Sequence, residues 1–147
     1  MPDAQDGSLQ KNLNYEVKYA GVMVYCKNAI LLAKRIEKCP ITNKTTDFPG
    51  YWSIFCGSIE KGESPIECAQ RELFEETKIN VEINDLQYMK DSGELSIYKY
   101  ELDSLVLPEL NFEHTESGWF MMDSINILPE PIDKKIINLI ELHKLDA

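Results

Sequence analysis

The sequence predicts an α/β fold in which a mixed β-sheet is flanked by helices on both faces, as an α/β/α sandwich. Strand-like segments lie before and after one strongly amphipathic helix, and a second amphipathic helix ends the chain. A sheet built from such segments has two apolar faces, and each face needs a covering helix. The length of 147 residues, with 44% hydrophobic residues, suits one domain with a sizeable core.

The first half of the chain is predicted to contain a loose head followed by three strands. Residues 1–13 lack apolar periodicity and are expected to form a flexible segment, which leaves residues 14–147 as a single domain. A polar loop over residues 37–50 has the length of a substrate-binding segment. The strands are rich in aliphatic and aromatic residues and are expected over Tyr15–Tyr25, Ala29–Ile36 and Trp52–Phe55.

The second half begins with the clearest helix signal in the chain. Ser64 supplies an N-cap and Pro65 a first-turn proline, and apolar residues then recur at helical spacing to about Thr77. The remaining elements are four strand-like stretches and a final helix, expected around Val81–Ile83, Leu86–Lys90, Glu94–Leu102 and Trp119–Met122 and over Ile132–Leu145. These elements complete the predicted sheet and its second covering helix.

The composition excludes several classes of protein. Fifteen basic residues against twenty-five acidic ones give a formal charge of −10, which makes the chain a poor candidate for binding duplex nucleic acid through its phosphates. No run approaches the roughly 20 apolar residues that a membrane helix needs. The polar, acidic N-terminus does not have the pattern of a signal or transit peptide. We therefore expect a cytoplasmic protein that does not bind membranes.

The four cysteines agree with that location. Cys26, Cys39, Cys56 and Cys68 are spaced 13, 17 and 12 residues apart, without the paired short spacing of a zinc site. Four cysteines suffice for two disulfides, but a cytoplasmic chain keeps its thiols reduced. We expect four free thiols with a structural role.

Three carboxylates on the first helix indicate a metal site. Glu72, Glu75 and Glu76 lie at positions i, i+3 and i+4, so they project within an arc of roughly 100° on one face. Like charges at this spacing destabilise a helix by a few tenths of a kcal/mol per pair. The helix macrodipole also disfavours anions near the C-terminal end. On the helix alone, a solvated acidic face and a site for Mg²⁺ or Mn²⁺ are both open interpretations.

The loop before the helix decides between a solvated acidic face and a metal site. Gly57 and Gly62 permit a tight backbone, Glu63 adds a carboxylate, and Arg71 carries a rigid fork of donors that can orient a carboxylate. Residues 57–79, GSIEKGESPIECAQRELFEETKI, resemble the Nudix box G-x5-E-x7-R-E-U-x-E-E-x-G-U, in which U is aliphatic. Eight of its nine specified positions are filled at the right spacing. The metal site is therefore the better interpretation.

The resemblance extends over about residues 17–145 and implies the Nudix-type sandwich. AGVMVYCKNAILLAKR resembles the paired strands that open Nudix domains, and EHTESGWFMMDSI resembles a later strand. Two positions depart from the pattern. Lys78 replaces the late glycine, whose left-handed conformation costs other residues about 1–2 kcal/mol, so we expect a change of chain geometry with Asn80 available for the turn. Phe55-Cys56 replaces the usual Pro-Gly in the loop beside the metal.

The resemblance implies an Mg²⁺-dependent pyrophosphohydrolase, with Mn²⁺ as an alternative ion, that cleaves a nucleoside diphosphate linked to another moiety. A nucleoside triphosphate or a dinucleoside polyphosphate is the expected substrate. The metal site would comprise Glu72, Glu75, Glu76 and Gly57, with Glu72 either a ligand or the catalytic base. Arg71 completes the catalytic set on the helix.

Other site residues are expected from outside the helix. Glu116 is the chosen base or ligand from the later strand, and Glu113 is the reserve. Arg35, Glu63 and Tyr98 are expected on the substrate-binding side of the site, with Glu63 acting through Arg71.

The two histidines and two tryptophans are expected to lie outside the catalytic site. His114 and His143 are expected to be exposed and to belong to no catalytic dyad. Trp52 and Trp119 are expected in the core.

Two other functions are kept as alternatives: an RNA 5′-end pyrophosphohydrolase, which needs to hold only a few nucleotides, and a non-catalytic Nudix-fold module that binds a nucleotide for regulation. The residues leave the oligomeric state open, with a homodimer among the options.

Overall fold

The computed structural model describes residues 16–42, 45, 49–127 and 131–145. The predicted flexible segment 1–13 lies outside the described residues, so the division of the chain at residue 13 stays a prediction. The elements in chain order are β1 (Tyr19–Cys26), β2 (Ala29–Arg35), β3 (Trp52–Ser53), β4 (Phe55–Ser58), α1 (Pro65–Thr77), η1 (Ile83–Asp85), β5 (Gln87–Ser92), β6 (Leu95–Glu101), β7 (His114–Met121), η2 (Met122–Ile127) and α2 (Lys134–Leu145).

A single mixed sheet forms the middle of the molecule. Its main path runs β3-β2-β1-β6-β5, while β4 pairs with β1 and β7 pairs with β2. β1 and β6 are parallel, and the other pairs are antiparallel. Antiparallel neighbours can be joined by short turns, whereas the parallel pair requires the long connection that contains α1. The mixed sheet predicted from the sequence is therefore confirmed.

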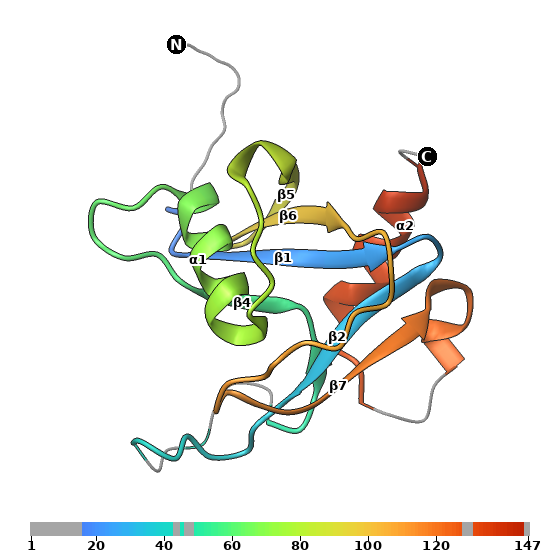
Figure 1. The fold of residues 1–147 in the computed structure, drawn as a ribbon, viewed down its shortest axis with the longest axis horizontal. Helices are drawn as coiled ribbons and strands as arrows, with labels where there is room; N and C mark the ends of the chain where they lie inside the picture. Colours follow the sequence, from blue (N-terminus) through green and yellow to red (C-terminus); the bar gives the residue numbers. More distant parts are fainter. Residues whose placement is uncertain (1–15, 43–44, 46–48, 128–130, 146–147) are drawn as a thin grey trace.

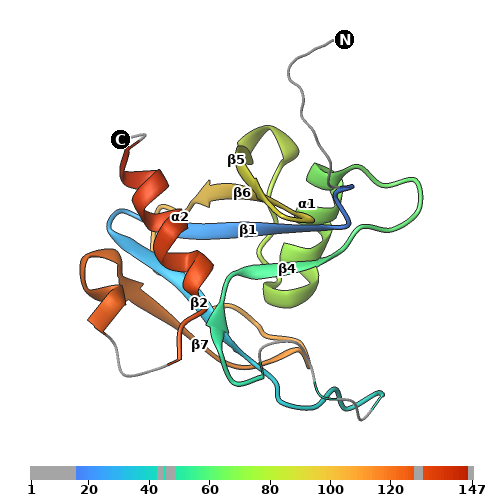
Figure 2. The same cartoon turned by 180° about the vertical axis from the view of Figure 1, so that it is seen from behind.

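The two helices cover opposite faces of this sheet. α1 lies in front of the strands in Figure 1, and α2 lies in front of them in the reverse view of Figure 2. Under α1 the core contains Val22, Leu31 and Leu73, and under α2 it contains Met23 and Ile136. Successive residues of β1 thus enter different cores, which is why both sides of this strand are apolar.

Helix α1 is closed at both ends by local interactions. Ser64 and Glu67 form a reciprocal capping box, in which each side chain accepts a hydrogen bond from the other residue's backbone N–H. At the other end Lys78 itself adopts the left-handed conformation, with φ 64°, and its N–H donates to the carbonyl of Phe74. The expected change of geometry with a turn at Asn80 is wrong, because Lys78 takes the backbone conformation that glycine has in the box pattern.

The structure corrects five of the predicted elements. The stretch Val81–Ile83 is not a strand, because Val81 packs into the core under α1 and Ile83 begins a 3-10 turn. Trp52–Phe55 is split at Ile54 into two short strands, and α2 begins at Lys134 rather than at Ile132. β1 begins at Tyr19, and β7 begins at His114, five residues before the expected start.

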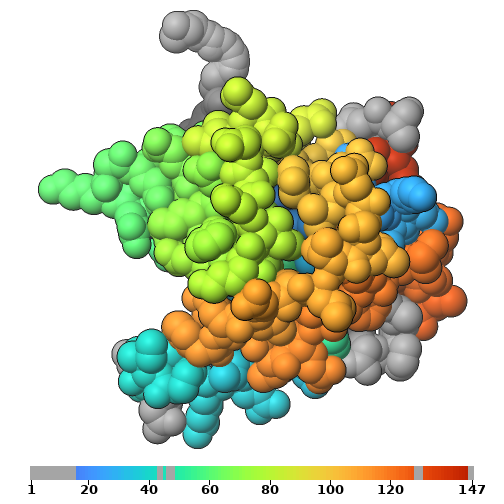
Figure 3. All heavy atoms as spheres, viewed as in Figure 1, coloured from blue at the N-terminus to red at the C-terminus, as the bar shows by residue number. Residues whose placement is uncertain are grey.

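The segment between β6 and β7 packs beside α1. The N–H of Glu109 donates to the carbonyl of Thr77 over 2.9 Å, which ties this segment to the end of the helix. In Figure 3 the orange residues of the segment form a continuous surface with the green residues of α1. The indole of Trp119 also donates to the carbonyl of Val106 over 2.9 Å. These contacts bring the residues just before β7 close to the carboxylates of α1.

Among the described residues, the helices are all too short or too polar to pass through a bilayer. The four cysteines are free thiols, as expected.

Candidate active site

Three carboxylates from two distant parts of the chain converge beside α1. Glu72 and Glu76 project from the same face of the helix, one turn apart, and Glu113 comes from the residue before β7. One oxygen from each lies within 4.8 Å of the others. Glu113, held in reserve from the sequence, therefore stands where the later-strand carboxylate was expected.

Glu76 is the most deeply buried of the three. Its side chain is fully buried, and neither carboxylate oxygen has a hydrogen-bond partner among the described residues. Burial, with the nearby Glu72 carboxyl group, raises the pKa of Glu76 well above its usual range. Burial and Glu72 also raise the pKa of Glu113. A buried carboxylate without a partner is costly, and a bound cation would supply one.

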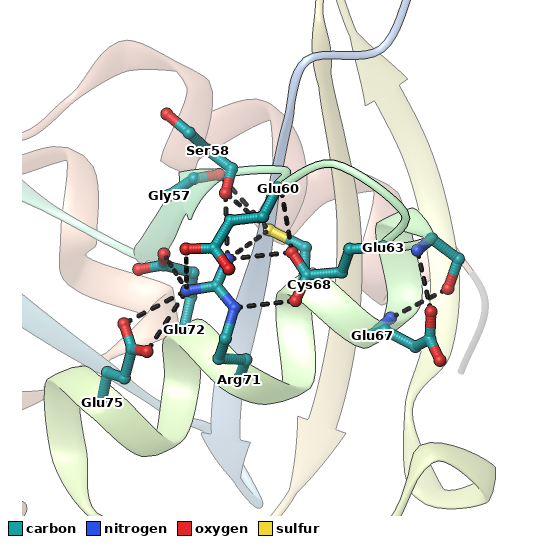
Figure 4. Close-up of polar contacts among 10 residues, drawn as sticks. Gly57, Ser58, Glu60, Glu63, Glu67, Cys68, Arg71, Glu72 and Glu75 are labelled. Atoms are coloured by element: carbon teal, nitrogen blue, oxygen red, sulfur yellow. Dashed lines mark hydrogen bonds and ion pairs between the residues drawn. The ribbon is translucent and has the colours of Figure 1, made fainter.

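Arg71 joins the loop before α1 to the helix carboxylates (Figure 4). Its Nε and Nη2 donate to the two oxygens of Glu63 over 2.7 and 2.9 Å. Its Nη1 donates to Glu72 over 2.9 Å and to Glu75 over 3.2 Å, while Nη2 also reaches the carbonyl of Ser58 over 3.0 Å. The planar guanidinium can donate to acceptors on both of its edges at once, whereas the single ammonium group of a lysine could not.

The Glu63 carboxylate closes the loop as well as holding Arg71. The N–H of Glu60 donates to Glu63 Oε1 over 3.0 Å. The hydrogen bonds from Arg71 lower the pKa of Glu63 to about 2. The negative charge of Glu63 is therefore engaged by Arg71, which agrees with the expectation that Glu63 acts through that residue.

Gly57 lies directly against Glu72. A Cβ atom at this position would overlap the Glu72 carboxyl group, so any other residue would displace it. Gly57 belongs to β4, which pairs with β1 and holds this backbone close to α1. The absence of a side chain here is what lets the carboxylate reach its position.

An irregularity in the pairing of β2 with β7 sets the position of Glu113. Lys34 pairs with Glu116, but Arg35 pairs with His114, so Thr115 is an extra residue on β7. Such a bulge changes the direction of the side chains beyond it. Just before β7 the N–H of Glu113 donates to the Asn111 side chain over 3.0 Å, and this hydrogen bond fixes the backbone that carries the Glu113 side chain.

A cavity of about 580 Å³ opens beside the carboxylates. Glu72 and Glu113 contribute carboxylates to its lining, and Arg35 and Lys135 contribute cationic side chains to the same lining. Asp133, which is 7% exposed, accepts a 2.6 Å hydrogen bond from Lys135 and holds this lysine at the start of α2. Volumes of this size accommodate a small organic ligand.

The sequence reasoning included Arg35 but missed Lys135. The available signal was the Asp-Lys-Lys run that precedes the last amphipathic helix. A run of this kind is usually a solvated helix start, so only the packing of α2 against the sheet assigns Lys135 to the cavity.

Three predicted site residues do not join this arrangement. Glu75 is exposed and its carboxylate pairs with Arg71, so it lies outside the cluster of three carboxylates. Glu116 is exposed on β7 and faces Lys34 at 3.8 Å, on the other side of the bulge. Tyr98 is buried under α1, with its ring against Tyr88, and is absent from the lining of the cavity.

The expectation that both histidines are exposed is wrong. His114 is only 5% exposed, and its ring packs edge-to-face on Phe55. Burial lowers the pKa of His114 to about 4, so the ring is neutral at physiological pH. His143 is half-buried on α2, where its Nδ1 lies 3.2 Å from the Nζ of Lys99. Trp52 is buried and Trp119 packs on the core, as expected.

The donor set fits a hard divalent cation. Carboxylate oxygens are the ligands that Mg²⁺ and Mn²⁺ prefer, and the described cluster offers three of them. The unpartnered oxygens of Glu76 are a second observation in favour of an ion at this point. Glu72, Glu76 and Glu113 are thus the residues that could hold it.

Comparison with known proteins shows the family of this chain. A family model of the NUDIX domain matches residues 16–141. The NAD-capped RNA hydrolase NudC of Chromobacterium violaceum is 30% identical over 109 residues, which cover 70% of this chain and 40% of that protein. Putative hydrolase 111R of Invertebrate iridescent virus 3 is 31% identical over 117 residues, covering 74% and 61%. The chain thus spans less than two thirds of the length of these relatives.

A solved structure has the same fold. The C. elegans Ap4A hydrolase in a binary complex superimposes with a TM-score of 0.63 at 19% identity, over 87% of this chain and 96% of that one. The family match covers all the strands, helix α1 with Arg71, Glu72 and Glu76, and the first part of α2. From the box motif, the sheet with its two covering helices and this match, it follows that the chain belongs to the Nudix family of hydrolases.

Proposed function

We propose that this chain is a divalent-metal-dependent pyrophosphohydrolase that cleaves a nucleoside diphosphate linked to another moiety. One observation carries the proposal: Glu72, Glu76 and Glu113 converge within 4.8 Å, beside a cavity that also contains Arg35 and Lys135. Anionic and cationic groups in one cavity suit a ligand that brings both a metal ion and phosphates. A cytoplasmic location accompanies this proposal as a prediction.

Glu72 and Glu76 would hold Mg²⁺ or Mn²⁺, with Arg71 orienting Glu72 from the side, and one oxygen of Glu113 faces them within 4.8 Å. Such an ion supplies neutralisation of charge on the pyrophosphate. Arg71 itself is engaged by four carboxylates, which leaves it a positioning residue. Its hydrogen bonds keep Glu72 aimed at the cluster.

The hydrolytic step requires a group that accepts a proton. A water oxygen forms a bond to phosphorus, the anhydride P–O bond breaks, and the leaving phosphate departs with the electron pair of that bond. We assign Glu113 as acceptor of the proton from the water, because it lines the cavity and comes from the opposite side to α1. Arg35 and Lys135 bind the phosphate oxygens of the substrate in this assignment.

The substrate proposed is a nucleoside triphosphate or a dinucleoside polyphosphate. The cavity of about 580 Å³ has room for a nucleotide. The similarity to an Ap4A hydrolase agrees with the dinucleoside polyphosphate, although at 19% identity it bears on the fold alone. The 30% identity to an NAD-capped RNA hydrolase favours one other candidate, a nucleotide-capped RNA 5′ end.

A nucleotide panel tests this proposal. Purified protein with Mg²⁺ or Mn²⁺ is incubated with nucleoside triphosphates, dinucleoside polyphosphates, NAD, NAD-capped RNA and 5′-triphosphorylated RNA, and the phosphate-containing products are separated. Glu76→Gln removes the buried charge in the cluster and is the test variant. Glu82→Gln changes an exposed glutamate outside the cluster and is the matched control.

We expect turnover of one substrate class, loss of that turnover in Glu76→Gln and with a chelator, and retention in Glu82→Gln. Turnover of capped RNA alone would replace the proposed substrate and leave the chemistry in place. Tight nucleotide binding without turnover of any member would overturn the hydrolase and favour the regulatory module.

A further inference from the structure

We propose that His114 is a positioning residue for Glu76, holding its carboxylate toward the metal by a hydrogen bond from the imidazole N–H. This inference rests on the proposed metal site and deepens it. His114 is assigned no contact with the metal or the substrate.

Two buried side chains face each other without other partners. The His114 Nδ1 lies 3.9 Å from Glu76 Oε1, and both side chains are completely buried. Neither ring nitrogen of His114 and neither oxygen of Glu76 has a hydrogen-bond partner among the described residues. Four unpartnered polar atoms at one buried contact are unusual, because nearly all such atoms in proteins are paired.

The chemistry of the two groups is complementary. A neutral imidazole keeps one N–H donor, and a carboxylate only accepts. A buried donor without an acceptor, or an acceptor without a donor, is destabilising, and each of these two groups lacks what the other offers. A shift of about 1 Å would bring the 3.9 Å separation into hydrogen-bond range.

The surroundings of His114 leave its ring little freedom to turn away. The ring stacks edge-to-face on Phe55, with centroids 5.4 Å apart and an interplanar angle of 72°. Phe55 is itself fully buried in the core under α1. The backbone of His114 pairs with Arg35 at the bulge of β7. A ring held this firmly can orient the side chain that it contacts.

His114 acts on Glu76 rather than joining the cluster. The three oxygens that approach within 4.8 Å of one another belong to Glu72, Glu76 and Glu113. A residue one step behind a metal ligand fixes the orientation of that ligand, and losing it typically weakens metal affinity by about 10–100-fold. The same contact also accounts for a fully buried histidine side chain beside the site.

The experiment compares metal binding in matched variants. His114→Phe keeps a flat ring against Phe55 but has no N–H, and His114→Asn restores a donor near the place of Nδ1. His143→Phe removes the other histidine, which lies on α2 against Tyr25. Mn²⁺ affinity is measured by electron paramagnetic resonance in each variant, and the melting temperature is measured in a chelator.

We expect His114→Phe to weaken Mn²⁺ binding at least about 10-fold, with His114→Asn between it and wild type and His143→Phe unchanged. In a chelator, His114→Phe should melt close to wild type, because phenylalanine keeps a flat ring packed against Phe55.

Wild-type Mn²⁺ affinity in His114→Phe, with a lowered melting temperature, would show a packing role and overturn the inference. If that variant does not fold, wild-type Mn²⁺ affinity in His114→Leu, which also has no N–H donor, would overturn it. Loss of binding in Glu76→Gln would show in both cases that the metal site itself stands. Absence of Mn²⁺ binding by the wild type would overturn this inference together with the metal site.

Discussion

Gly57 and Glu72 are in such close contact that a single methyl group cannot be placed between them. A Cβ atom on Gly57 would lie 2.1 Å from Glu72 Cδ, far inside van der Waals contact. Glu72 is only 8% exposed and accepts a hydrogen bond from Arg71 on its other side, so it has little room to retreat. The strand before the helix thus sets the position of a helix carboxylate.

Replacing Gly57 with alanine should therefore impair catalysis. We expect Gly57→Ala to push the Glu72 carboxylate out of the cluster and to lower kcat about 100-fold, since a displacement near 1 Å can have that effect. Ser58→Ala is the matched control, because Ser58 uses its backbone carbonyl to accept from Arg71. Steady-state kinetics and Mn²⁺ affinity would check this, and near-normal kinetics in Gly57→Ala would contradict it.

Glu113 and Glu116 allow a direct comparison of two nearby carboxylates. We expect Glu113→Gln to lower kcat by about 100-fold or more, the usual effect of losing a general base. Glu116→Gln should be close to wild type, because Glu116 is exposed and makes one long contact with Lys34. Measuring kcat of the two variants and the wild type side by side tests this expectation. A larger loss in Glu116→Gln would contradict the assignment made from the β7 bulge.

The Glu63–Arg71 pair should make stability depend on pH. The pKa of Glu63 falls from 4.5 to about 2 on folding, so the stabilisation is complete above pH 4.5 and is lost as the pH falls toward 2. The full change in pKa would correspond to about 3 kcal/mol. We expect the pair to contribute about 1 kcal/mol to the free energy of unfolding, because solvent reaches this loop and screens the two charges.

Urea unfolding of wild type and Glu63→Gln in a chelator would measure this. The difference in free energy of unfolding should shrink as the pH is lowered through this range, because protonated Glu63 resembles glutamine. The comparison with Glu63→Gln cancels the titration of other carboxylates. Parallel stability curves for the two proteins would count against the ion pair.

Lys78 offers a test of backbone strain. Its φ of 64° is in the left-handed region, and Lys78→Gly should relieve a cost of about 1 kcal/mol there. The Nζ of Lys78 also lies 5.1 Å from the centroid of the Phe74 ring, a contact of about 0.5 kcal/mol that any truncation loses. Lys78→Ala is the control, since it loses this contact and keeps the strain.

Thermal or urea unfolding should therefore rank Lys78→Gly about 1 kcal/mol more stable than Lys78→Ala. Activity should be similar in both, because Lys78 is exposed and absent from the lining of the cavity. Equal stabilities would show that the helix end relaxes in the variants.

The helix and most strands could be predicted from local patterns. Ser64 and Pro65 mark the start of α1, and the observed capping box confirms the signal. Local patterns misjudged Val81, because aliphatic residues at every second position occur in strands and also in loops whose side chains pack into a core. They misjudged Lys78 as well, since this residue adopts a positive φ that a lysine does not favour.

The carboxylate from outside the helix could not be chosen by sequence alone. Glu113 and Glu116 are three residues apart, and both precede Trp119 in the same strand region. The bulge at Thr115 separates them, placing Glu113 with α1 and Glu116 beside Lys34. A bulge arises from the pairing of two strands, and β2 is far from β7 in the chain.

The sequence by itself determined the fold class, the family and the helix that bears Arg71, Glu72 and Glu76. These follow from short-range spacing, because a helix repeats every 3.6 residues and its carboxylates share a face whatever surrounds them. Only the tertiary structure decided that Glu113 joins the cluster, that Lys135 lines the cavity and that His114 is buried against Glu76. Each of these depends on how distant segments pack and on which polar atoms that packing removes from water, and no local pattern encodes either.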